Sequence, residues 1–128
     1  MKTTSLIARY LLGLLFFVFG LNGFLHFIPL PPPAGLAGQF MGALYMSGEL
    51  SVIMALQLGA GVLLLANRFV PLALVLITPF FVNSVAFHLF LEPSGLVMAA
   101  IFTALNLYLA WCYRSSYAVL LTARATPA

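Results

Sequence analysis

The sequence contains no aspartate and only two glutamates against five lysines and arginines, so charged side chains make up 5% of its 128 residues. An ordinary soluble domain is about 25% charged and about 45–50% apolar, whereas 64% of this chain is apolar. Such a composition cannot cover a surface that faces water, which excludes a soluble domain. The few cations are scattered along the chain, which excludes a nucleic-acid binder with a basic patch.

The chain has one cysteine, Cys112, which excludes an internal disulfide and a dithiol redox motif. It also lacks an HExxH or Cys/His cluster for zinc, a glycine-rich phosphate loop and a nucleophile elbow. We therefore predict no metal site and no self-sufficient catalytic site. These absences leave open whether the protein is an enzyme.

Long apolar runs fill the chain, whose mean hydropathy is +1.16. A helix of about 20 apolar residues crosses the hydrocarbon core of a bilayer. The chain has four such runs, interrupted by prolines from Pro29 onward, by Asn67 and Arg68, and by the turn signal that begins at Glu92. The predicted spans cover residues 6–28, 48–66, 69–91 and 96–113, and a tail covers 114–128. We predict an all-α fold in which residues 1–128 form one membrane domain, a four-transmembrane-helix bundle.

The stretch between the first two spans is apolar but rich in glycine. We interpret residues 34–46 as a short interfacial or re-entrant helix, with Ser47 capping the second span. The alternative is one long tilted helix that includes both pieces.

The cations predict the orientation of the bundle. With four spans, Lys2, Arg9, Arg68, Arg114 and Arg124 all fall on one side of the bilayer, and the two links on the other side contain none. By the positive-inside rule that side is cytoplasmic. We therefore expect an integral membrane protein, in the cell inner membrane if the source is bacterial, with both termini in the cytoplasm.

Polar side chains collect in the outer half of the predicted bundle. A bilayer penalises unpaired polar groups by several kcal/mol, so such side chains normally face the bundle interior or a wet cavity. We therefore predict an outward-opening polar cleft between the first three spans. The candidate ligand-binding residues are Asn22, His26, Glu49, Asn83, Ser84 and His88.

Each candidate also has a purely structural interpretation. Glu49 follows Ser47 and is placed as a helix-capping residue would be. The two histidines lie near the interface, where they suit amphipathic anchors equally well. The asparagines, including Asn106, suit hydrogen bonds between helices, and Gln57 fits either a structural or a site role.

The segment from Ala8 to Asn22, with its Arg9, Leu12-Gly13 and Phe19-Gly20 pattern, resembles the start of a DoxX-family membrane protein. The resemblance continues to about residue 114, through the Arg68–Leu74 segment and through Pro79, Asn83 and His88. Two positions depart from the family pattern: Asn22 or Gly23 stands where many members carry lysine, and Gln57 where many carry glutamate. The resemblance implies a four-helix membrane bundle.

The family also suggests functions, since relatives include a membrane subunit of thiosulfate:quinone oxidoreduction, partners of redox enzymes and a receptor-assembly chaperone. Our leading hypothesis is a membrane subunit that binds a quinone or another lipophilic small molecule in the cleft and works with a redox-enzyme partner. The alternative is a non-catalytic assembly factor or scaffold. A small transporter or channel ranks third: four spans are too few for internal inverted repeats, so it would need a homo-oligomer such as a dimer, and a deep ionisable coupling residue is missing unless Glu49 is buried. The lipid bilayer is the one partner common to all three.

Overall fold

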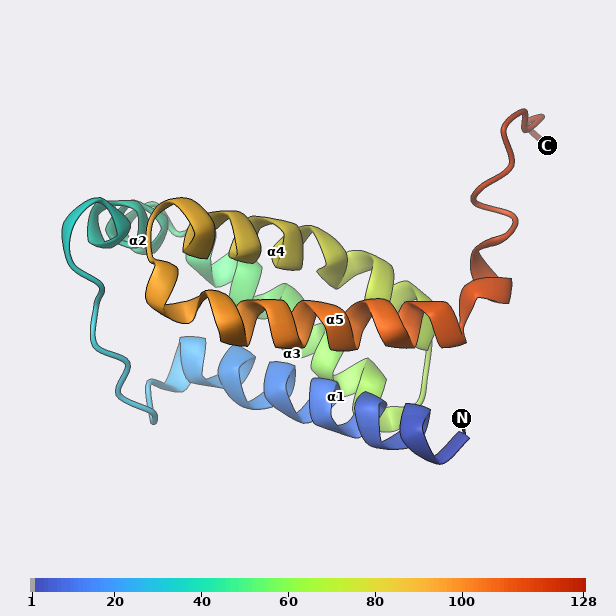
Figure 1. Ribbon diagram of the computed structural model, residues 1–128, viewed down its shortest axis with the longest axis horizontal. Helices are drawn as coiled ribbons and strands as arrows, with labels where there is room; N and C mark the ends of the chain where they lie inside the picture. Colours follow the sequence, from blue (N-terminus) through green and yellow to red (C-terminus); the bar gives the residue numbers. More distant parts are fainter. Residues whose placement is uncertain (1) are drawn as a thin grey trace.

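The computed structural model describes residues 2–128, and every regular element over that range is a helix (Figure 1). The elements are α1 (Lys2–Leu25), α2 (Gly35–Ser47), α3 (Glu49–Ala66), α4 (Val70–Phe90), the 3-10 turn η1 (Pro93–Gly95), α5 (Leu96–Cys112) and the 3-10 turn η2 (Arg114–Tyr117). Four helical segments are long and apolar enough to cross a membrane. The all-α, four-helix prediction is therefore confirmed.

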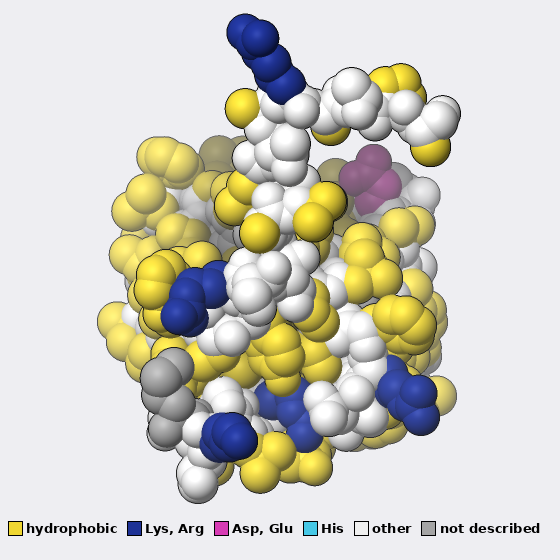
Figure 2. All heavy atoms as spheres, turned by 90° about the vertical axis from the view of Figure 1, so that its right-hand side faces the viewer, with side chains coloured by type: hydrophobic (Ala, Val, Ile, Leu, Met, Phe, Trp, Pro, Cys, Tyr) yellow, Lys and Arg dark blue, Asp and Glu magenta, His cyan; other side chains and the backbone are white. Residues whose placement is uncertain are grey.

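The four long helices α1, α3, α4 and α5 form a closed bundle in which each packs mainly against two neighbours, and α2 lies at one end (Figure 1). Neighbours along the chain run antiparallel, so the start of α1, the α3–α4 link and the end of α5 share one end of the bundle. We call this the amino-terminal end, and the opposite end, which holds His26, Glu49 and Glu92, the distal end. Lys and Arg side chains gather on the amino-terminal end (Figure 2).

The closest packing joins α1 and α3, and glycine makes it possible. A Cβ atom placed on Gly20 would lie 2.6 Å from the backbone nitrogen of Leu58, and one on Gly61 would lie 2.5 Å from that of Phe17. Small residues allow this approach, which matters in a bilayer because no hydrophobic force drives helices together there. Beside this contact lies the apolar core, which includes Leu12, Phe16, Leu64, Ile77 and Leu109.

The first helix ends at Leu25, three residues before the predicted end at 28. His26 takes a left-handed conformation (φ 53°), and its amide still bonds to the carbonyl of Asn22 at 2.9 Å. This C-terminal geometry stops the helix before the prolines do. The chain then runs without helix to Gly35.

Residues 34–66 form two helices, as the short-helix interpretation predicts. Gly48 separates them with φ 89°, a conformation that costs glycine little. The predicted cap is wrong, because Gly48 and not Ser47 occupies the N-cap position of α3; the hydroxyl of Ser47 instead accepts the amide of Glu49 at 3.3 Å from one residue further out. The alternative of one long tilted helix is therefore not observed.

Candidate functional site

Asn22 is the one sequence-predicted site residue that is buried, and its side chain is used to fold the chain. Its Oδ1 accepts the backbone N–H of Ile28 at 2.6 Å, and its Nδ2 donates to the carbonyl of the same residue at 3.2 Å. This pair of bonds turns the chain from the end of α1 into the proline-rich link. The amide of Asn22 is thus engaged by backbone rather than turned toward a cleft.

His26, Glu49 and Asn83 are exposed. The side-chain amide of Asn83 donates to the carbonyl of Pro79, one turn earlier in the same helix, at 2.8 Å. All three residues lie toward the distal end: His26 follows α1, Glu49 begins α3 and Asn83 lies in α4. Within residues 2–128 no side-chain hydrogen bond joins them to one another.

Ser84 and His88 are half-buried near the end of α4. The Nδ1 of His88 lies 3.0 Å from the carbonyl oxygen of Glu92, and its ring lies directly against the backbone of Gly95. A side chain at position 95 would collide with this ring. His88 therefore packs against the turn between α4 and α5.

The six predicted residues share the distal region, but within residues 2–128 no side-chain hydrogen bond joins any two of them. Across residues 2–128 there is no group of three His, Cys, Asp or Glu side chains that could hold a metal ion. Convergence of these six residues on one ligand stays a prediction.

The side chain that the sequence interpretation missed is Arg9, which is only 4% exposed although it lies in an apolar helix. Its Nη1 donates to the carbonyl of Leu64 in the last turn of α3, and its guanidinium lies 4.5 Å from the ring centre of Tyr10. The last carbonyls of a helix have no partner within the helix and carry partial negative charge. Arg9 therefore caps α3 from the neighbouring helix.

Two amide side chains are buried in the middle of the bundle. The Nδ2 of Asn106 donates to the hydroxyl of Thr78 at 3.2 Å and joins α5 to α4, as the interhelical interpretation predicts. The Oδ1 of Asn106 has no partner among the described residues. Gln57 is buried on the same face of α3 as Ala60 and Leu64. These amides lie deeper than the predicted cleft.

An apolar groove runs between α1 and α5 with a volume of about 450 Å³. From α1 it is lined by Leu11, Leu14, Leu15, Val18 and Phe19, and from α5 by Ile101, Phe102 and Leu105. These residues lie in the middle of their helices, at the depth of the hydrocarbon core. The sequence interpretation placed its cleft between the first three spans, whereas this groove involves the first and the fourth.

Comparison with protein-family models, with curated proteins and with solved structures gives no match for this chain.

Proposed function

We propose that this chain is a DoxX-like multi-pass membrane protein that binds a quinone or another lipophilic small molecule, as a membrane subunit of a redox system. The observation that carries the proposal is the groove between α1 and α5. It has a volume of about 450 Å³ and is shallow and open along the bundle surface, as a lipid-facing site would be. Its apolar lining suits a hydrocarbon tail, and the four apolar helices suit a bilayer.

In this proposal the polar head of the ligand lies near His26. The α1 helix continues from Phe19 toward His26 over seven residues, about 10 Å at 1.5 Å per residue. The exposed imidazole can donate or accept a hydrogen bond. His88, on α4 at the same end, is the second candidate. Electrons would reach the quinone from a partner enzyme.

The proposed orientation puts both termini in the cytoplasm and the distal end outside, because every Lys and Arg lies toward the amino-terminal end or in the tail. In a bacterium this corresponds to the inner membrane. The head-group end of the groove then faces the outer leaflet.

Binding of a short-chain ubiquinone to the purified protein in detergent tests the proposal. Leu14→Trp adds a large side chain inside the groove, whereas Leu76→Trp adds the same side chain on α4 outside it. The two residues are comparably exposed, at 53% and 46%, so their substitutions perturb the surface to a similar degree. We expect Leu14→Trp to lower ubiquinone retention severalfold and Leu76→Trp to leave it unchanged.

A second pair of variants tests the head group. We expect His26→Ala to weaken binding and His26→Gln, which keeps a hydrogen-bonding group, to weaken it less. If the unmodified protein retains no ubiquinone, or all variants retain it equally, the proposal is wrong.

A specific observation favours the alternative of an assembly factor or scaffold. Ser51, Ala55 and Gly59 are exposed on α3 at four-residue spacing, and a Cβ at Gly59 would meet nothing within 4 Å. A small-residue face of this kind lets another helix approach closely in a bilayer. By contrast, Gly13 and Gly20 are used within the molecule, so substitutions there test folding rather than partner binding.

The scaffold function predicts that Gly59→Leu abolishes capture of a membrane partner by crosslinking, while Val82→Leu on the exposed surface of α4 does not. Ubiquinone binding would survive Gly59→Leu. Unchanged capture by the Gly59→Leu variant would contradict the scaffold function.

A further inference from the structure

Helices α4 and α5 meet at the distal end of the bundle (Figure 1), and the imidazole of His88 lies against the turn that joins them. Its ring contacts the backbone of Gly95, and its ring centre lies 5.1 Å from that of Phe87. Its Nδ1 lies 3.0 Å from the backbone carbonyl oxygen of Glu92. These three contacts fix the orientation of the half-buried ring.

The contact with Glu92 selects one tautomer of the His88 ring. A backbone carbonyl oxygen can only accept a hydrogen bond, so Nδ1 must carry the hydrogen and donate it. In the neutral ring the other nitrogen, Nε2, then has no hydrogen and presents a lone pair. The side-chain carboxylate of Glu92 bonds elsewhere, because its Oε1 accepts the hydroxyl of Ser94 at 3.2 Å.

The Nε2 atom of His88 is accessible to a ligand. Within residues 2–128 the ring makes its hydrogen bond through Nδ1, and Nε2 has no partner. Over the same range Asn106 Oδ1 is the one buried side-chain nitrogen or oxygen that lacks a partner, so Nε2 is not enclosed. An unbonded acceptor therefore lies at the distal end, held in a fixed direction.

This acceptor lies in line with the α1–α5 groove. Phe102, which lines the groove, follows Gly95 by seven residues, and Gly95 contacts the His88 ring. Seven residues make two turns on the same face of α5, about 10 Å at 1.5 Å per residue. A ligand whose tail lies in the groove therefore places its head group at the end of the bundle that holds His88.

We propose that His88 makes this site selective for a hydroxyl head group, so that the protein binds a quinol, the reduced form of the proposed ligand, more tightly than the quinone. A quinol hydroxyl can donate to Nε2, whereas the carbonyl oxygens of a quinone only accept and would face a lone pair. The exposed His26 has no hydrogen-bonded ring nitrogen among the described residues, so it can present a donor or an acceptor and gives no preference. The selectivity rests on the proposed quinone function, but the tautomer can be measured without a ligand.

Nitrogen-15 NMR of histidine-labelled protein measures the tautomer. The chain has two histidines, so His26→Gln leaves His88 as the one labelled ring in protein purified without a histidine tag. The spectrum is recorded in detergent under alkaline conditions, which keep the ring neutral. We expect the hydrogen on Nδ1 and an unprotonated Nε2. A ring with its hydrogen mainly on Nε2 would overturn the proposal, because that atom would then be a donor.

Binding of short-chain ubiquinol and ubiquinone to the purified protein, without oxygen, measures the preference. We expect ubiquinol to bind about two- to tenfold more tightly, the effect of one hydrogen bond. His88→Asn keeps an amide that can donate to the carbonyl of Glu92 but has no atom at the Nε2 position, so it should abolish the preference. The matched variant His26→Asn should weaken binding of both forms alike and keep the preference.

Gly95→Ala moves the His88 ring without removing it. Gly95 has a φ of −96°, which alanine adopts readily, but the added Cβ would collide with the ring. We expect this variant to lose both the Nδ1–H tautomer and the preference for ubiquinol. An unchanged spectrum together with an unchanged preference would contradict the role of the Gly95 contact in fixing the ring.

The outcomes separate this inference from the proposed function. Equal binding of ubiquinol and ubiquinone by the unmodified protein would overturn the selectivity alone. Retention of neither form would overturn the proposed function and the selectivity with it. Loss of the preference in His26→Asn but not in His88→Asn would assign it to the other histidine and overturn the role of His88.

Discussion

Replacing Gly61 by alanine tests the α1–α3 contact with a single added methyl group. The new Cβ would lie 2.5 Å from the backbone nitrogen of Phe17 and 2.9 Å from the carbonyl oxygen of Gly13. Non-bonded carbon atoms normally approach to about 3.5–4.0 Å, so the two helices must separate locally by about 1 Å. Both neighbours are backbone atoms, and no side-chain rotation can relieve the collision.

Overpacking of this kind costs about 1–3 kcal/mol in well-packed interiors, and we expect Gly61→Ala to lower the free energy of unfolding by that amount. For a chain of this size the loss corresponds to a fall in Tm of about 4–12 °C. Thermal unfolding in detergent can be followed through the reactivity of the single thiol, Cys112, which is half-buried in the folded protein.

Gly59 provides the control, because it lies two residues earlier on the same helix and its Cβ would meet nothing within 4 Å. Gly59→Ala should leave the Tm unchanged or raise it slightly, since alanine favours a helix over glycine by about 1 kcal/mol. Equal Tm values for the two alanine variants would refute the close α1–α3 approach at Gly61.

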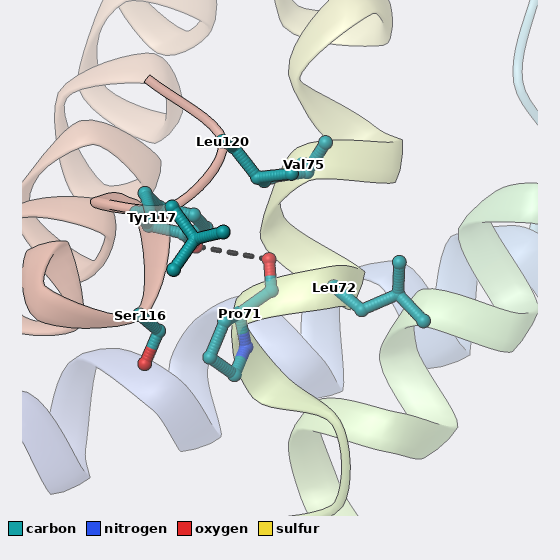
Figure 3. A pocket seen from close by; sticks show the side chains of 7 residues that line it. Pro71, Leu72, Val75, Ser116, Tyr117 and Leu120 are labelled. Carbon is teal, nitrogen blue, oxygen red and sulfur yellow. Dashed lines mark hydrogen bonds between the residues drawn. The ribbon is translucent and has the colours of Figure 1, made fainter. Parts of the chain in front are cut away.

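Three further substitutions have definite expected outcomes. Asn22→Ala removes both hydrogen bonds to the backbone of Ile28 and should lower the free energy of unfolding, in the same assay, by about 1–3 kcal/mol. An unchanged free energy would contradict the role of Asn22 in holding the end of α1. Asn106→Leu removes a buried oxygen that has no partner among the described residues, together with one hydrogen bond to Thr78. The free energy of unfolding should therefore change by less than about 1.5 kcal/mol. A larger loss would mean that this oxygen has a partner. Tyr117→Phe should free the tail from Pro71 and speed its digestion by trypsin. Because burial raises the pKa of Tyr117, the hydrogen bond of its hydroxyl to the carbonyl of Pro71 (Figure 3) stabilises the fold below pH 10.0 and is lost as the pH rises through the folded-state pKa. Spectrophotometric titration of the tyrosines, compared with that of the Tyr117→Phe variant, measures the pKa of Tyr117.

The lengths of the apolar runs were enough to predict the four long helices, because a bilayer requires about 20 apolar residues per span. The break at Gly48 was also visible in the sequence, as the Ser47-Gly48 pair. The end of α1 was not, because it depends on the side chain of Asn22 reaching the backbone of Ile28 six residues later. Proline marks where a helix cannot continue, but a contact of this kind can end it earlier.

The rotation of each helix about its axis was the main obstacle to predicting the site. The few polar residues of α4 are not segregated to one face, so its sequence does not show which face is buried. The structure buries Ala73, Ile77 and Phe81, and Asn83 lies off that stripe and is exposed. The position of Asn83 along its helix was enough to place it toward the distal end. It could not show that the side-chain amide bonds to a carbonyl of its own helix.

Arg9 shows a second limit of the sequence interpretation. The positive-inside rule treats every cation as a marker of the cytoplasmic surface, and Arg9 was counted in that way. Its burial follows from a neighbour that only the fold supplies, the carbonyl of Leu64 at the end of α3. The arginine within an otherwise apolar run was the available signal, since an ionisable residue inside a span normally has a specific partner.

The central claim is that four helices cross the bilayer and leave the amino-terminal and distal ends on opposite sides of it. Single-cysteine labelling with a membrane-impermeant maleimide, in a Cys112→Ser background, tests this directly. Ser94 and Ser116 are both exposed and lie at the distal and amino-terminal ends, respectively. We predict that Ser94→Cys is labelled only from outside the cell and Ser116→Cys only from the cytoplasmic side, whereas labelling of both from the same side would contradict the account.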